Sequence, residues 1–159
     1  MKVFLAGIIQ GSKAAAEIHD QDWRTPIKRV LSRHLPDAIV YCHYSEHPNS
    51  ITYDLPTLRA TLCEGIRRAA QSDLLIAYVP GASMGTAIEM HAAYQAGAAV
   101  LTISPLAANW VIRAYSDSIL PDLEAFETFA SAGGLAELMQ IKCSKPDRPA
   151  DPAGNRQPT

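Results

Sequence analysis

Apolar runs of strand length alternate with amphipathic segments along most of this chain. Nearly continuous apolar runs at 3–7, 38–42, 74–79 and 98–104 are typical of central parallel strands that helices cover on both faces. A shorter run at 118–120 indicates a fifth strand. Strands that alternate with helices are joined by right-handed crossovers. The pattern therefore predicts an α/β fold, a doubly wound (flavodoxin- or Rossmann-like) parallel sheet of five strands.

Apolar residues recur at helical spacing between these runs. A first helix is expected to have Thr25 as its N-cap, Pro26 as its first residue, and an inward stripe of Ile27, Val30, Leu31 and Leu35. A second helix follows a possible cap at Asp54, and its stripe is Leu58, Leu62, Ile66 and Ala69 or Ala70. A third begins at Thr86, with Ile88, Ala92 and Ala96 on one line and Met90 and Ala93 beside it.

The end of the chain divides into two helical segments and a polar tail. The segments at 122–130 and 135–141 are separated by Gly133 and Gly134. The tail at 144–159 contains four prolines and no large aliphatic or aromatic side chain, so it cannot bury enough surface to become ordered. We expect one domain over 1–143 and a disordered tail over 144–159.

Composition narrows the range of partners. The 14 basic and 16 acidic residues nearly cancel, so nothing indicates a nucleic-acid surface. No apolar run approaches the ~20 residues of a membrane span. The three widely spaced cysteines, Cys42, Cys63 and Cys143, suggest reduced thiols and a cytoplasmic protein. Cys42, His43 and His47 are close enough in sequence to raise the question of a metal site, but Pro48 disrupts the helical spacing that such a pair needs.

The most informative segment is SDLLIAYVPGASMGTAIE, at 72–89. It combines a buried strand, a turn with glycines, and a helix that carries Glu89 near its start. α/β folds place their chemistry at this edge of the sheet, and a helix dipole favours an ionised carboxylate there. Glu89 is therefore a candidate nucleophile.

This segment and the first loop, VFLAGIIQGS, together resemble the nucleoside 2-deoxyribosyltransferase-like family, which includes hydrolases of deoxynucleoside 5′-monophosphates. The resemblance covers about residues 2–115 and depends mainly on the SMGTAIE turn, with Asp73 opening the strand before it. It implies that Glu89 attacks the anomeric carbon and forms a covalent deoxyribosyl intermediate. A second base accepts the sugar in the transferases, and water accepts it in the hydrolases.

The family also has a second acid, an aspartate on the preceding helix about two dozen residues before the nucleophile. The nearest carboxylate here is Glu64, and Asp54 could substitute from the loop. The resemblance therefore leaves three outcomes open, since either residue can serve or the activity can be altered or lost.

The resemblance places Gly7, Gln10, Gly11, Ser83 and Gly85 around the sugar and phosphate end of the substrate. A serine at 83 favours a 5′-monophosphate, because an acidic residue there would repel it. Gln10 stands where the hydrolases have an arginine, and Lys13 or Arg113 could supply the missing charge. Family members complete their sites with a neighbouring subunit, so we expect at least a homodimer in which Asn109 reaches the partner's substrate.

These observations predict an enzyme that cleaves or exchanges the N-glycosidic bond of a 2′-deoxynucleoside or its 5′-monophosphate. They imply a small-molecule substrate, no metal and no organic cofactor. Two alternatives remain, a nucleotide-binding or sensor domain that has lost turnover and a glycohydrolase of a larger nucleotide such as NAD.

Overall fold

A five-stranded parallel sheet organises residues 1–144, the part of the chain that the computed structural model describes. The strand order is β2-β1-β3-β4-β5, and every neighbouring pair is parallel. The strands are β1 (Lys2–Gly7), β2 (Ile39–Cys42), β3 (Leu74–Tyr78), β4 (Ala99–Ile103) and β5 (Ser118–Leu120). The predicted doubly wound α/β fold is confirmed, including its short fifth strand.

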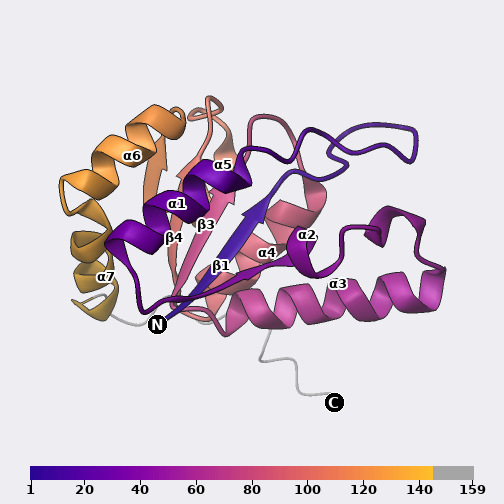
Figure 1. Cartoon of the computed structure of the whole chain (residues 1–159), viewed down its shortest axis with the longest axis horizontal. Coiled ribbons are helices and arrows are strands. Elements are labelled where there is room, and N and C mark those ends of the chain that lie inside the picture. Colours follow the sequence, from indigo (N-terminus) through magenta and orange to yellow (C-terminus); the bar gives the residue numbers. More distant parts are fainter. Residues whose placement is uncertain (145–159) are drawn as a thin grey trace, which may run out of the picture.

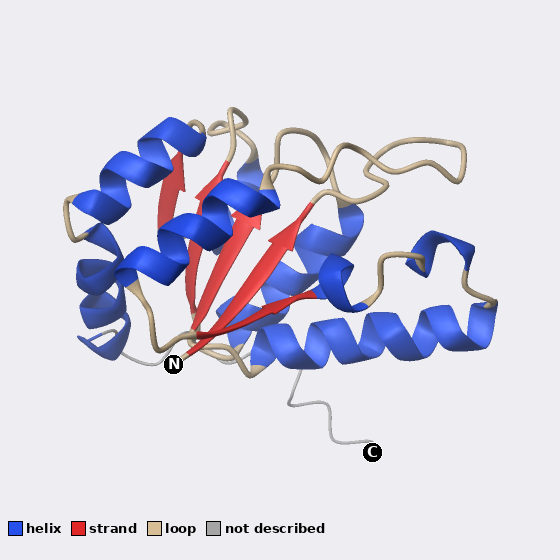
Figure 2. Cartoon of the chain, in the orientation of Figure 1, coloured by secondary structure: helices blue, strands red, loops and turns tan. Residues whose placement is uncertain are grey.

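Helices cover both faces of the sheet (Figures 1 and 2). One layer contains α1 (Arg24–His34), α6 (Leu123–Ser131) and α7 (Gly134–Ser144). The other contains α3 (Leu55–Ala70), α4 (Met84–Gln95) and α5 (Trp110–Tyr115). The segment between β2 and α3 contains the short helix α2 (His43–Glu46) and a single 3₁₀ turn, η1 (Ser50–Thr52). Among residues 1–144, no helix is both long enough and apolar enough to cross a membrane.

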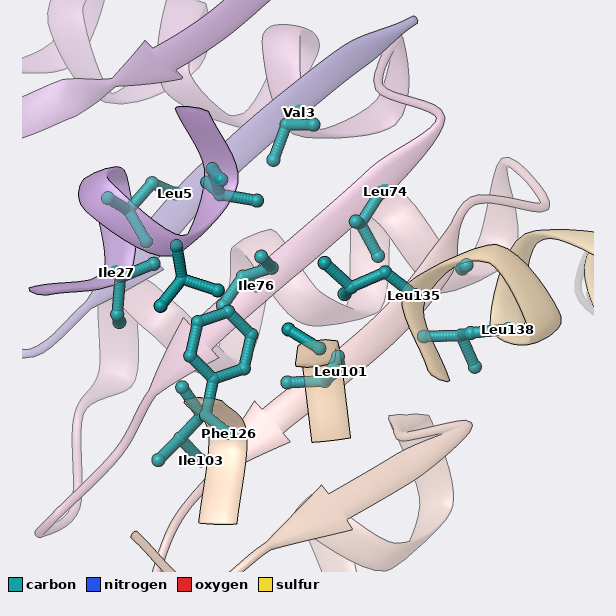
Figure 3. Packing of buried hydrophobic residues seen from close by; sticks show 14 of the residues in the cluster. Val3, Leu5, Ile27, Leu74, Ile76, Leu101, Ile103, Phe126, Leu135 and Leu138 are labelled. Atoms are coloured by element: carbon teal, nitrogen blue, oxygen red, sulfur yellow. The ribbon is translucent and has the colours of Figure 1, made fainter. Parts of the chain in front are cut away.

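The two helical layers have separate apolar cores. Figure 3 shows the first, in which Leu5, Ile76 and Leu101 of three adjacent strands meet Ile27 of α1 and Phe126 of α6. The second core is built mainly from smaller side chains, among them Ala69 of α3 and Ala93 of α4. Small side chains allow helices to approach the sheet and one another closely. This second layer therefore brings α3 and α4 together.

The sheet order creates a switch point between β1 and β3, where the chain winds in opposite directions. The connection from β1 leads to α1 on one face, and the connection from β3 leads to α4 on the other. Crevices at the carboxyl ends of the strands on either side of such a point are the usual ligand sites of open α/β sheets.

Three predictions about the helices need correction. Helix α1 begins at Arg24 without a side-chain cap, so Thr25 is not its cap. In α3 the inward residues are Thr61, Gly65 and Ala69, whereas Leu58 and Leu62 are about 40% exposed. In α4 the buried line is Thr86, Glu89, Met90 and Ala93, and Ile88 faces outward. In α3 the close contact with α4 selects small residues, which a search for large apolar residues overlooks.

Helix α3 starts as predicted, because the Asp54 side chain accepts a hydrogen bond from the Thr57 N–H at 3.1 Å. Asp122 caps α6 in the same way, through the Ala125 N–H. The predicted disordered tail lies outside the described residues, except for Ser144, which ends α7.

Replacing Ile76 by alanine should lower the free energy of unfolding by roughly 2–5 kcal/mol, because the side chain is fully buried in the central strand and its loss leaves a cavity. Ile39→Ala is the matched control, since Ile39 lies on edge strand β2 and is 71% exposed. Urea unfolding measures the loss in each variant, provided that the dependence of the free energy of unfolding on urea concentration is the same as in the wild type. Equal losses in the two variants would contradict the position of the core.

Candidate active site

A cavity of about 230 Å³ lies at the switch point between β1 and β3. Three segments line it. The loop after β1 contributes Gly7, Ile9, Gln10 and Gly11. The region from α2 to α3 contributes His43, Ser50, Ile51, Leu58 and Leu62. The start of α4 contributes Ser83, Met84, Gly85, Thr86 and Glu89.

The loop after β1 forms one wall of the cavity. Gly7 has no room for a side chain, because a Cβ atom there would collide with the Trp23 ring and approach the Tyr78 carbonyl oxygen within 2.9 Å. Gly11 has a φ of +61°, a conformation that glycine adopts without strain. The Gln10 amide donates hydrogen bonds to the carbonyl oxygens of Lys13 and Ala15, which ties the loop together.

The opposite wall is the N-terminus of α4. Ser83 is the N-cap residue, and its hydroxyl lies 2.9 Å from the hydroxyl of Thr86. The first N–H groups of a helix have no partner within the helix, and they carry partial positive charge. The cavity is therefore suited to an anionic group at this end. A Cβ atom on Gly85 would meet nothing within 4 Å, so this side of the cavity is open.

Glu89 lies on the second turn of α4 and is only 8% exposed. Burial raises the pKa of its carboxyl group to about 8, and the nearby Arg24 charge offsets this only in part. Burial therefore opposes the helix dipole, which was expected to favour an ionised Glu89. The cost of removing the charge from water outweighs the dipole, which acts mainly within the first turn.

Arg24 is a buried cation behind the cavity, with 5% of its surface exposed. Its guanidinium group donates to the Cys42 sulfur at 3.3 Å and lies over the rings of Trp23 and Tyr44. Burial lowers its pKa, while Cys42, Tyr44 and Glu89 oppose that change. Because no carboxylate within residues 1–144 forms a salt bridge with Arg24, its charge is available to stabilise an ionised Glu89 at longer range.

The two candidates for the second acid do not line this cavity. Glu64 accepts hydrogen bonds from Arg67 and Arg68, which hold its pKa below the ordinary value. Asp54 is exposed and caps α3. The α3 residue that faces Glu89 is Gly65, because a Cβ atom there would lie 3.5 Å from Glu89 Oε1. Helix α3 therefore presents no carboxylate to Glu89.

His43 begins α2, directly after β2, and lines the same cavity. Its Nδ1 atom is buried and has no hydrogen-bond partner among residues 1–144. Burial, with smaller contributions from His47 and Arg24, lowers its pKa. Within the described residues no three His, Cys, Asp or Glu side chains are grouped as a metal site requires.

Asn109 lies away from Glu89, in a second cavity that shares Ser83 and Met84 with the first. Its side chain accepts hydrogen bonds from the N–H groups of Val111 and Ile112 and so caps α5. Lys13 and Arg113, the two candidates for a phosphate-binding charge, do not line the first cavity. Lys13 instead donates to the Ile18 carbonyl oxygen and pairs with Glu17.

Sequence reasoning missed three residues around Glu89. Gly65 was hidden in a helical pattern, although a glycine inside a helix is costly and often marks a close approach. His43 was considered only as a metal ligand. Arg24 gave no signal, because its burial depends on contacts with residues from β2 and α2.

No protein-family model and no curated protein matches the sequence. Several solved structures share its fold. A 2-deoxyribosyltransferase from Bacillus psychrosaccharolyticus is 16% identical, with a TM-score of 0.60 over 84% of this chain and 95% of that one. A conserved protein from Enterococcus faecalis V583 is 16% identical, with a TM-score of 0.54 over 83% and 98%. The Clostridium botulinum CMP N-glycosidase BcmB is 18% identical, with a TM-score of 0.50 over 84% and 99%.

Glu89 should make stability depend on pH. Its folded pKa of about 8 is above its ordinary value of 4.5, so the folded state binds an extra proton between these values. The stabilisation from a neutral Glu89 is complete below 4.5 and is lost as the pH rises through about 8. Over this range the loss should be on the order of 5 kcal/mol.

Glu89→Gln should remove this part of the pH dependence, because glutamine resembles the neutral acid and does not titrate. Urea unfolding at several pH values tests this, with the exposed Glu124→Gln as the control. If Glu89→Gln kept the wild-type slope, the raised pKa would be contradicted.

Proposed function

We propose that this protein, which has the fold of the nucleoside 2-deoxyribosyltransferase-like family, cleaves or exchanges the N-glycosidic bond of a 2′-deoxynucleoside or its 5′-monophosphate. The observation that carries the proposal is the position of Glu89. A buried carboxyl group lies in the cavity at the switch point, between a loop with glycines and a helix N-terminus. Related folds include an enzyme that transfers deoxyribose and one that hydrolyses CMP.

The chemistry suits a buried carboxylate. Cleavage of an N-glycosidic bond builds positive charge on the sugar, and a carboxylate below the anomeric carbon can stabilise this charge and then bond to it. The ionised form of Glu89 is the reactive one. With little competing water, its negative charge interacts strongly with the developing cation.

A 5′-phosphate fits the other end of the cavity. The N-terminus of α4, the Ser83 and Thr86 hydroxyls and the open side at Gly85 are all on this wall. Among the described residues that line the cavity none is lysine or arginine. Recognition of phosphate would then depend on backbone N–H groups and hydroxyls, which favour an anion without a formal positive charge.

One observation favours a second candidate, a nucleotide-binding or sensor domain without turnover. Helix α3 presents glycine instead of a carboxylate to Glu89. A site that binds nucleotides but cannot assist the departing base would bind without catalysis. An assay for released base decides between the two candidates, because only an enzyme releases free base.

The homodimer and the cytoplasmic location stay predictions. Exposed apolar side chains around the second cavity support self-association, notably Met84 and Trp110, each 79% exposed, and Leu106. Large apolar side chains grouped on a surface are typical of subunit contacts.

Replacing Glu89 by glutamine should lower turnover by several orders of magnitude, because the amide cannot form the glycosyl ester. Chromatography of released base from deoxynucleosides and their monophosphates, with and without an acceptor base, measures this. Glu124→Gln is the control. A Glu89→Gln variant with near-normal activity would show that another residue is the nucleophile.

Ser83 should contribute to the preference for monophosphates over nucleosides. If the α4 wall binds the phosphate, the wild type prefers monophosphates, and Ser83→Asp should lower kcat/KM for them by roughly 10- to 100-fold through charge repulsion. Ser83→Asn is the matched control, with nearly the same shape and no charge. Equal effects of the two substitutions on nucleosides and monophosphates would place the phosphate elsewhere.

A further inference from the structure

The reaction proposed above needs a proton donor that the candidate carboxylates do not supply. When the glycosidic bond breaks, its electron pair goes to the nucleobase, and most bases leave readily only if they receive a proton. Glu64 is held by two arginines, and Asp54 caps a helix. The α3 position that faces Glu89 is a glycine.

The space above Gly65 is occupied by a histidine from another element. The point where a Gly65 Cβ atom would lie is 3.2 Å from Nδ1 of His43 and 3.5 Å from Oε1 of Glu89. The imidazole nitrogen and the carboxyl oxygen therefore both lie beside the same stretch of α3 backbone. Any side chain at position 65 would crowd the His43 ring. The glycine thus allows His43 its present place.

No hydrogen bond within residues 1–144 engages the His43 ring, and the burial of Nδ1 leaves Nε2 as the nitrogen that can exchange a proton with a ligand. Its Nδ1 atom has no hydrogen-bond partner within residues 1–144, and its side chain lines the cavity. The His47 ring lies beside it, with the ring centres 5.2 Å apart. The charged and titratable groups that face it are Arg24 of α1, His47 just after α2, and Glu89 of α4.

We propose that His43 is the general acid and base of this site, in the role that a carboxylate on α3 would otherwise have. In the first step a lone pair of the Glu89 carboxylate bonds to C1′ and the C1′–N bond breaks. The imidazolium of His43 donates its proton to the departing base and becomes neutral. In the second step the neutral imidazole takes a proton from water, or from an acceptor base, as it attacks C1′. The ester bond breaks, and the Glu89 carboxylate and the imidazolium are regenerated.

In the reactive state Glu89 and His43 together carry one proton. Burial raises the pKa of Glu89 to about 8 and lowers that of His43. At rest the carboxyl group is therefore the protonated one and the imidazole is neutral, whereas the reactive arrangement has the proton on the imidazole. Activity should fall when both groups are protonated and also when both are deprotonated, which gives a bell-shaped pH profile.

A matched pair of substrates tests this role. For the guanine or cytosine deoxynucleotide that the wild type cleaves, the comparison is its cationic form, methylated at N7 of guanine or N3 of cytosine. The methylated base leaves as a neutral molecule and needs no proton. His43→Ala should lower kcat for the ordinary substrate by about 10²- to 10⁴-fold and for the methylated one by less than about tenfold. Retained cleavage of the methylated substrate also shows that the variant folds.

The pH profile gives a second measurement that a merely structural role would not change. With the ordinary substrate the activity of the wild type should give a bell-shaped pH profile. The residual activity of His43→Ala should rise with pH as Glu89 ionises and reach a plateau above a pH of about 8. His47→Ala, which removes the neighbouring ring but not a cavity residue, should keep the bell and the wild-type substrate ratio.

Failure of this inference is distinguishable from failure of the proposed function. If the wild type is active and depends on Glu89, but His43→Ala slows both substrates equally or leaves both unchanged, the inference is wrong and the proposed function stands. If the wild type cleaves no deoxynucleoside and no deoxynucleoside monophosphate, whichever base it carries, the proposed function fails and the inference falls with it.

Discussion

The burial of one carboxyl group at the contact between α3 and α4 is the constraint that shapes the rest of this site. An acid that is 8% exposed must either lose its charge or find compensation, because its hydration is lost. The structure provides both, through a pKa of about 8 and a buried cation, Arg24, at longer range. The small inward residues of α3, Thr61, Gly65 and Ala69, allow this close contact.

The parallel sheet decides where this carboxyl group meets other chemistry. The β2-β1-β3 order brings the loop after β1 and the start of α4 to opposite sides of one crevice, although they are far apart in sequence. The same order places His43, the first residue after β2, on the edge of that crevice. The fold thus gathers groups from three strand ends that lie far apart in the sequence.

Stability and reactivity oppose each other at Glu89. The neutral acid suits the folded state at rest, whereas the carboxylate is the form that can attack a sugar. Active sites often hold such groups away from their most stable state and recover the cost through packing elsewhere. Here the apolar core on the other face of the sheet, around Leu5, Ile76 and Phe126, supplies that packing.

The sequence alone determined the strands, the cap at Asp54 and the candidate Glu89, because these features depend on residues a few positions apart. Only the tertiary structure decided which face of α3 is buried, because the small residues on that face are explained by the close contact with α4. It also decided that Glu64 is paired outside the cavity, that Arg24 is buried, and that Gly65 makes room for His43 beside Glu89. A pKa depends on burial and on charges from distant segments, so its direction at Glu89 could be known only after the chain had brought those segments together.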